Sequence, residues 1–162
     1  SVNKPFNYIT LNKGAKDGVK PDQGIITNAG IAGVTLKVSD SYSLAMSVLN
    51  SRWGVSAKIK KNNYFGSLVW EGGDYRTANL KEIPIHVDIA RGDTIVTSGF
   101  SSIFPEGIII GTINDFSRGE GDNYYTITLS LGTDFKSLSY VEIIENSHRD
   151  EIWELEKMTT ND

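Results

Sequence analysis

The chain has 162 residues, of which 39% are hydrophobic and 22% are charged, and its formal net charge is −4. A chain of this length buries about 70% of its unfolded surface, enough for one or two domains with a real core. The mild acidity argues against binding to nucleic acid or to anionic lipid, because both use basic surfaces. The absence of cysteine excludes disulfides, thiolate nucleophiles and thiolate metal sites.

The sequence contains no segment that predicts a membrane anchor. No apolar run reaches the roughly 18 to 20 residues needed to cross a bilayer, and no signal peptide is visible. The opening Ser-Val-Asn is typical of the cut edge of a longer protein. We therefore expect any anchor to lie outside this sequence.

Short β-branched or alternating runs, separated by glycine-containing turns, predict an all-β fold. The predicted strands are residues 7–11, 24–27, 33–38, 43–49, 54–60, 66–70, 94–97, 107–113, 124–131 and 140–144. So many short strands favour small barrels, because closure removes exposed edges. Near the C-terminus, residues 150–158 predict a short helix, and we expect residues 159–162 to be disordered.

Two stretches of the chain follow the same plan, and they suggest an internal duplication. In residues 22–36 and 92–111, a glycine precedes a β-branched strand that ends in threonine, and a glycine-containing loop leads to a second apolar strand. An alternating pair of strands follows each stretch. This repetition predicts two half-similar β modules.

A serine hydrolase is one function that this β pattern could support. His86, Asp88, Asp93 and Ser98 follow the chain order of a chymotrypsin-type triad. They fall within thirteen residues, however, whereas a triad converges from separate loops. The flank Thr-Ser-Gly-Phe also lacks the Gly-x-Ser-x-Gly pattern. We expect no catalytic residue, and the hydrolase stays as a less favoured alternative.

Acidic side chains in predicted hairpin tips are the candidates for glycosidase chemistry. The candidates form two groups, one of Glu71 and Asp74 and one of Asp115, Glu120 and Asp122. Such chemistry needs two carboxyl groups across a cleft, one of them with a raised pKa. Acids at hairpin tips usually only solvate the turn, so we expect neither a metal site nor a cofactor here.

Aromatic side chains could form a surface that stacks on sugars or binds a partner. The aromatic candidates are Trp53, Tyr64, Phe65, Trp70, Tyr75, Tyr124 and Tyr125. The opposing interpretation is that most of them fill barrel interiors. Tyr64, Phe65 and Trp70 are the best candidates for a partner surface, and a glycan- or peptidoglycan-binding module stays open as an alternative.

Four motifs, in chain order, resemble the family of the rod shape-determining protein MreC. They are Leu-Asn-Lys-Gly-Ala-Lys-Asp-Gly-Val at residues 11–19, Gly-Ile-Ala-Gly-Val at 30–34, Arg-Gly-Asp-Thr-Ile-Val-Thr-Ser-Gly at 91–99 and Phe-Pro-Glu-Gly-Ile-Ile-Ile-Gly at 104–111. Residues 60–88 and the tail from residue 147 match no motif of the family.

The resemblance implies a non-catalytic scaffold of bacterial cell-wall elongation. Members of the family have a short cytoplasmic start, one transmembrane helix, a coiled coil and a periplasmic part of two β-barrels, which are similar to the chymotrypsin double barrel without its catalytic residues. The implied location is the periplasmic face of the inner membrane. The implied partners are MreB, MreD, the elongation-specific transpeptidase (a class B penicillin-binding protein), its glycosyltransferase partner and further copies of the protein, as a dimer or larger assembly.

The resemblance also implies which residues shape the barrels. The motif residues expected to hold turns, strand crossings and a barrel cap are Gly14, Gly18, Gly24, Gly33, Gly92, Asp93, Thr97, Ser98, Gly99, Phe104, Pro105, Gly107 and Gly111. Residues 8–52 and 118–146 are predicted to form the first barrel, residues 53–117 an inserted second barrel, and residues 147–162 a tail. Two sequential barrels that divide near residues 60–88 are the alternative.

Overall fold

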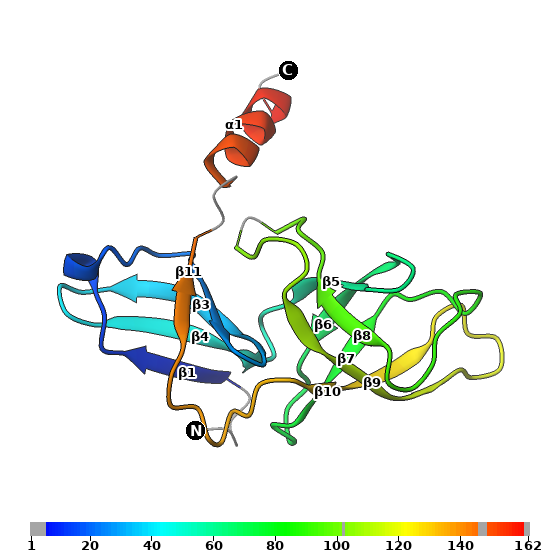
Figure 1. Cartoon of the computed structure of the whole chain (residues 1–162). Coiled ribbons are helices and arrows are strands. Elements are labelled where there is room, and N and C mark those ends of the chain that lie inside the picture. The colour runs from blue at the N-terminus through cyan, green and yellow to red at the C-terminus, as the bar shows by residue number, and fades with distance from the viewer. Residues whose placement is uncertain (1–5, 102, 146–148, 161–162) are drawn as a thin grey trace.

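The computed structural model describes residues 6–101, 103–145 and 149–160, and it contains two β units with a helix beyond one of them (Figure 1). The elements are β1 (Phe6–Leu11), the 3-10 turn η1 (Ala15–Asp17), β2 (Gly24–Thr27), β3 (Gly30–Val38), β4 (Ser43–Asn50), β5 (Val55–Ile59), β6 (Phe65–Val69), β7 (Thr77–Lys81), β8 (Thr94–Thr97), β9 (Ile109–Ser117), β10 (Thr126–Leu131), β11 (Glu142–Ile144) and α1 (Arg149–Thr160).

The first unit is a five-stranded sheet in the order β1-β4-β3-β2-β11, which we call the open sheet. All four of its strand pairs are antiparallel. Its central strand β3 is buried from Gly30 to Thr35. Ile25, Ile31 and Leu49 are almost fully buried in its core, so the burial of these apolar side chains holds the sheet together.

The second unit is a closed barrel of six strands in the order β10-β7-β6-β5-β8-β9. Strand β5 shows how its sequence fits this position, because Val55, Ala57 and Ile59 are buried while Ser56 and Lys58 between them are partly exposed. This alternation places one face of the strand in the barrel interior. The fold class predicted from sequence, all-β with a closed barrel and a C-terminal helix, is confirmed. Over the residues that the structure describes, the first unit differs in that its sheet is not closed.

Strand β10 lies in the closed barrel, where it pairs with β7 and β9. The predicted boundary, which gave residues 118–146 to the first unit, is therefore wrong for this strand, and only β11 of that segment returns to the open sheet. The alternation of Ile127 and Leu129 fits the interior of either unit. Local pattern therefore predicts the strand and leaves its distant partner undetermined.

Strand β7 was missed by the sequence prediction. Its sequence Thr-Ala-Asn-Leu-Lys buries only Ala78 and Leu80 on the barrel side. Alanine, asparagine and lysine are depleted in strands, so the local preference is weak. The strand forms because β6 and β10 bind it from both sides.

The C-terminal helix α1 is longer than predicted, since Thr159 and Thr160 belong to it instead of being disordered. Residues 161 and 162 of the same prediction lie outside the described residues. The glutamates, leucine, lysine and methionine of the helix are good helix formers. Within the part of the chain that the structure describes, no helix is both long and apolar enough to cross a membrane.

The loop after β10 joins the two units by side-chain and backbone hydrogen bonds. The Thr133 hydroxyl donates to the Ile31 carbonyl at 2.9 Å and lies 3.1 Å from the Thr27 hydroxyl. The Gly132 N–H donates to the Ile110 carbonyl at 3.0 Å. Thr133 is 4% exposed, so its hydrogen bonds are shielded from water and help to fix the units against each other.

The Phe104 ring contributes the apolar part of this junction. It comes from the loop between β8 and β9 and stacks on Trp53, with 6.2 Å between ring centroids. The ring also lies close to the open sheet, since a Cβ built at Gly24 would be only 2.8 Å from ring carbons Cδ1 and Cε1. Phe104 therefore packs against both units, and a side chain at Gly24 would push them apart.

Candidate partner-binding surface

The residues of the predicted triad are engaged separately in the structure. Ser98 is buried, and its hydroxyl donates to the Ser56 hydroxyl at 2.8 Å. The exposed His86 ring forms a T-shaped pair with the Tyr64 ring, with 6.0 Å between centroids. The Asp93 carboxylate lies 2.8 Å from the Lys61 ammonium. The Ser98 hydroxyl thus bonds to another hydroxyl and accepts from the Phe100 N–H, whereas an activated serine needs a base.

We expect Ser98→Ala to lower the free energy of unfolding by about 2 kcal/mol, because it removes the hydrogen bond to the Ser56 hydroxyl and the one that Ser98 accepts from the Phe100 N–H at 3.2 Å. Urea unfolding monitored by circular dichroism measures this loss. Ser56→Ala is the matched control and should cost less, because it removes only the bond between the two hydroxyls, and the double variant should lose no more than Ser98→Ala alone. If the wild type hydrolyses p-nitrophenyl acetate and Ser98→Ala does not, Ser98 is a nucleophile and this interpretation fails.

Two of the acidic candidates, Asp74 and Asp115, have arginine neighbours that favour their ionised form. The side-chain hydrogen bond from Arg76 lowers the pKa of Asp74, and the hydrogen bond from Arg91 lowers the pKa of Asp115. A glycosidase acid needs the opposite shift. The other acids have these positions: Glu71 pairs with Lys81 at 2.8 Å, Asp122 accepts from the Gly119 N–H at 2.8 Å, and Glu120 is exposed.

One cation of the closed barrel, Lys61, is shared between two acids. Lys61 lies 2.8 Å from Asp93 and 3.8 Å from Asp88. The hydrogen bond to Asp93 raises the pKa of Lys61. Among the described residues, no group of three or more His, Cys, Asp or Glu side chains is placed to hold a metal ion.

The predicted motif glycines fall into two geometrical groups. Gly14, Gly24, Gly33 and Gly111 lie where another backbone or ring passes closely, and Gly18, Gly92, Gly99 and Gly107 have φ between 83° and 92°. At Gly99 both constraints hold, because a Cβ would lie 2.9 Å from Cβ of Glu106 and φ is in the left-handed region. These glycines allow tight turns and close backbone approaches in both the open sheet and the closed barrel.

The Thr97 side chain fixes the loop between β8 and β9. Its hydroxyl donates to the Pro105 carbonyl at 2.7 Å and accepts from the Ile108 N–H at 2.9 Å. Thr97 is 1% exposed. The predicted cap at Phe104 and Pro105 is thus tied to the end of β8 and reaches the junction between the units.

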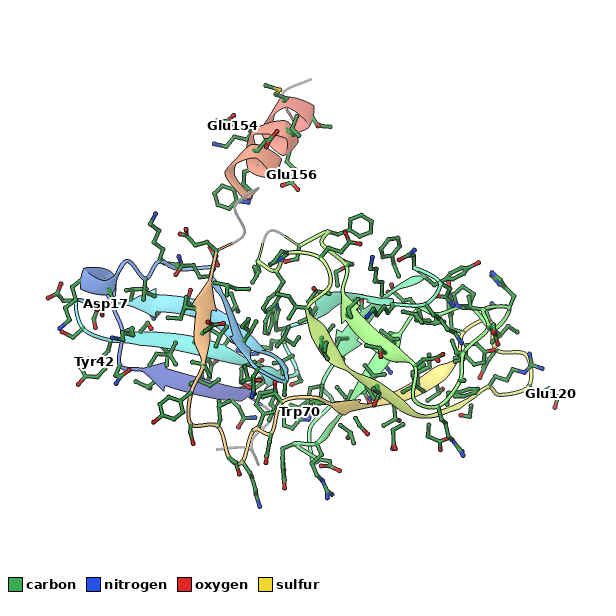
Figure 2. All side chains as sticks on the ribbon, in the orientation of Figure 1. Asp17, Tyr42, Trp70, Glu120, Glu154 and Glu156 are labelled. Atoms are coloured by element: carbon green, nitrogen blue, oxygen red, sulfur yellow. The ribbon has the colours of Figure 1, made fainter. Side chains whose placement is uncertain are left out.

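Trp70 belongs to the core, so its prediction as part of a partner surface is wrong. It is 2% exposed, and its indole N–H donates to the Asp74 carbonyl at 2.7 Å; Figure 2 shows it near the junction of the two units. It is in phase with Leu68, which points into the barrel. Successive side chains of a strand point to opposite faces, so Phe65, an odd number of residues from Leu68 and Trp70, points away from the barrel interior.

Phe65 and Phe100 form an exposed aromatic pair on the closed barrel. Their ring centroids are 4.4 Å apart, and the side chains are 46% and 68% exposed. Tyr64, next in the chain, is 41% exposed. We call Tyr64, Phe65 and Phe100 the aromatic cluster. An exposed pair of aromatic rings in contact, such as Phe65 and Phe100, is typical of surfaces that bind other proteins.

The strand and the loop that carry the aromatic cluster are held together by neighbouring side chains. Lys58 lies opposite Phe65 across the β5–β6 pair and forms an ion pair with Glu106. Glu106 in turn contacts Gly99, the residue before Phe100. Sequence reasoning missed Phe100, although it directly follows the Thr-Ser-Gly motif. The remaining aromatic candidates divide between two positions: Trp53, Tyr75 and Tyr125 pack against the core, and Tyr124 is exposed.

Comparisons with a family model and with curated proteins both match this chain to MreC. Residues 1–145 match the family model described as the rod shape-determining protein MreC, barrel core. The chain is 32% identical over 150 residues to the cell shape-determining protein MreC of Listeria monocytogenes, and the match covers 88% of this chain and 50% of that relative. The chain therefore spans about half the length of this curated relative.

Solved structures with similar folds carry the same family name. MreC from Pseudomonas aeruginosa has a TM-score of 0.82 at 20% identity, with 86% of this chain and 90% of that chain covered. The major periplasmic domain of the cell shape-determining filament MreC has a TM-score of 0.72 at 20% identity, with 91% and 90% covered. MreC of Helicobacter pylori, solved in complex with penicillin-binding protein PBP2, has a TM-score of 0.58 at 18% identity, with 77% and 78% covered.

Proposed function

Because this chain belongs to the MreC family of rod shape-determining proteins, we propose that it is a non-catalytic scaffold of bacterial cell-wall elongation. Its side chains support this role, since Ser98 is bonded to Ser56 and the candidate acids lie in ion pairs or turns. The observation that supports the proposal most is the aromatic cluster, because a scaffold needs a surface that binds other proteins and this one is exposed and apolar.

We propose that the aromatic cluster contacts the elongation-specific transpeptidase, a class B penicillin-binding protein. The solved complex of the Helicobacter pylori relative with PBP2 supports a partner of this class. Aromatic residues often contribute most of the binding energy at the centre of an interface. Phe65 lies in a strand of the barrel, and Phe100 follows Gly99, which packs closely against Glu106. Because both residues are already held in place, little conformational entropy is lost when a partner covers them.

The location and the further partners belong to the same proposal. We propose that the protein acts at the periplasmic face of the inner membrane, with an anchor and a coiled coil that precede these residues, and that it self-associates and acts with MreB, MreD and the glycosyltransferase. The family and the periplasmic domain solved for a relative support this location. The glycan-binding alternative has lost its best stacking candidate, because Trp70 is buried.

Co-purification of the full-length protein from its own bacterium tests the proposed function. Membranes are solubilised in mild detergent, the tagged protein is captured, and bound penicillin-binding proteins are labelled with fluorescent penicillin. We expect a class B transpeptidase to be enriched above an untagged control, and depletion of the protein to turn rods into spheres. Unchanged cell shape after depletion, together with no enriched transpeptidase, would refute the scaffold.

A further inference from the structure

The open sheet has two edge strands, β1 and β11, and their directions do not allow them to pair with each other in an antiparallel ladder. Because each of its four strand pairs is antiparallel, direction alternates along the order β1-β4-β3-β2-β11, and the two outer strands β1 and β11 run parallel to each other. Pairing them directly would therefore need a parallel ladder in an otherwise antiparallel sheet. The neighbouring barrel has six strands and closes with antiparallel pairs throughout.

A cavity of about 930 Å³ lies between these two edges. Thr10 and Leu11 at the end of β1 form one wall, and residues 139–143, which include the first two residues of β11, form the other. Leu11 and Val19 are buried and give the cavity an apolar floor, whereas Tyr140 at the rim is 92% exposed. The cavity is within the size range of pockets that hold ligands.

We propose that an extended segment of a partner protein enters this seam and becomes a sixth strand, antiparallel to both β1 and β11. An edge strand presents a row of N–H and C=O groups on its outer side, and an added strand can pair with them. One segment between the edges would pair on both of its sides. It would also complete a six-stranded antiparallel barrel like the one that the second unit forms by itself.

The walls of the seam define the chemistry of this segment. Successive side chains of a strand point to opposite faces, so alternate residues would face Leu11, Val19 and Ile143. The rim carries two carboxylates, Asp17 and Glu142, against one ammonium, Lys13. The segment is therefore expected to alternate apolar residues with basic ones. The wall formed by residues 139–143 matches about five residues of extended chain, roughly 17 Å.

The seam lies on the unit that does not carry the aromatic cluster. The cluster belongs to β6 and to the loops after β5 and β8 of the closed barrel, and the seam belongs to β1 and β11 of the open sheet. A segment in the seam would therefore leave the aromatic cluster uncovered. Binding at the seam goes beyond the proposed contact with the transpeptidase, and either can fail without the other.

The test uses a fluorescein-labelled synthetic heptapeptide that alternates lysine and valine. Its binding to the chain is measured by fluorescence anisotropy. We expect saturable binding that weakens at least tenfold in Val141→Asp, which places a charge in the seam. Val69→Asp, at an equally half-buried valine of the closed barrel, is the matched control and should bind like the wild type. Thermal unfolding confirms that both variants fold.

Two further measurements separate strand addition from other binding. A peptide with its central valine replaced by proline should not bind, because proline removes a ladder N–H. A nitroxide on the peptide N-terminus should broaden the amide resonance of Ile144 more than that of Ser139, since the added strand runs antiparallel to β11. Equal binding of the proline peptide, equal binding to Val141→Asp, or a dimer of the chain that forms without any peptide binding would overturn the proposal.

Discussion

Gly111→Val is expected to destabilise the closed barrel by about 3 kcal/mol or more. Gly111 is buried in β9, between Leu131 of β10 and Ile95 of β8. A Cβ at this position would overlap the Ser130 carbonyl oxygen of the paired strand. The backbone carbonyl cannot move without breaking the β9–β10 ladder, so the two strands would have to separate.

Urea unfolding followed by circular dichroism measures this effect, and Gly54→Ala is the control. A Cβ at Gly54 would have its nearest neighbour, the Leu68 carbonyl oxygen, at 3.8 Å, and its φ lies outside the left-handed region. We expect the control to stay within about 0.5 kcal/mol of the wild type. An unchanged unfolding midpoint in Gly111→Val would show that the strand crossing is not tight.

Replacing both exposed rings of the aromatic pair is expected to weaken transpeptidase binding at least about a hundredfold. Single aromatic residues at interface centres often contribute 2 kcal/mol or more, and two rings in contact act as one unit. The rings of Phe65 and Phe100 touch each other and solvent. The double variant Phe65→Ser with Phe100→Ser should therefore lose affinity and keep its fold.

Biolayer interferometry with the purified periplasmic part of the transpeptidase measures the affinity. The control is Tyr42→Ser, which removes an exposed aromatic ring, 57% accessible, from the open sheet unit; Figure 2 shows Tyr42 on the unit opposite the closed barrel. We expect the control to bind like the wild type. If Tyr42→Ser lost as much affinity as the double variant, binding would depend on exposed hydrophobic area in general and the aromatic cluster would not be the binding surface.

Much of the fold follows from patterns within a few residues. The alternation in residues 55–59 and the β-branched runs around Gly92 and Gly107 predict strands that the structure contains. Pairing between distant strands is different, because it depends on which buried surfaces meet after folding. For that reason β10 was placed in the wrong unit, and the weakly patterned β7 was not predicted.

The candidate surface was only partly predictable for a similar physical reason. Tyr64 and Phe65 were identified and are exposed, whereas Trp70 is buried because it is in phase with Leu68. The two-residue alternation of a strand, applied to β6, predicts that Phe65 and Trp70 lie on opposite faces. Phe100 is brought to Phe65 only by the fold of the loop after β8, and no spacing in the sequence encodes that contact.

Site-specific photo-crosslinking in living cells tests most directly whether the aromatic cluster holds the transpeptidase. Phe100 is replaced by p-benzoylphenylalanine in the full-length protein, and Tyr42 is replaced in the same way in a parallel strain. Irradiation is predicted to join the protein to its class B transpeptidase from position 100 and not from position 42. A crosslink from position 42 with none from position 100 would contradict the assignment of this surface.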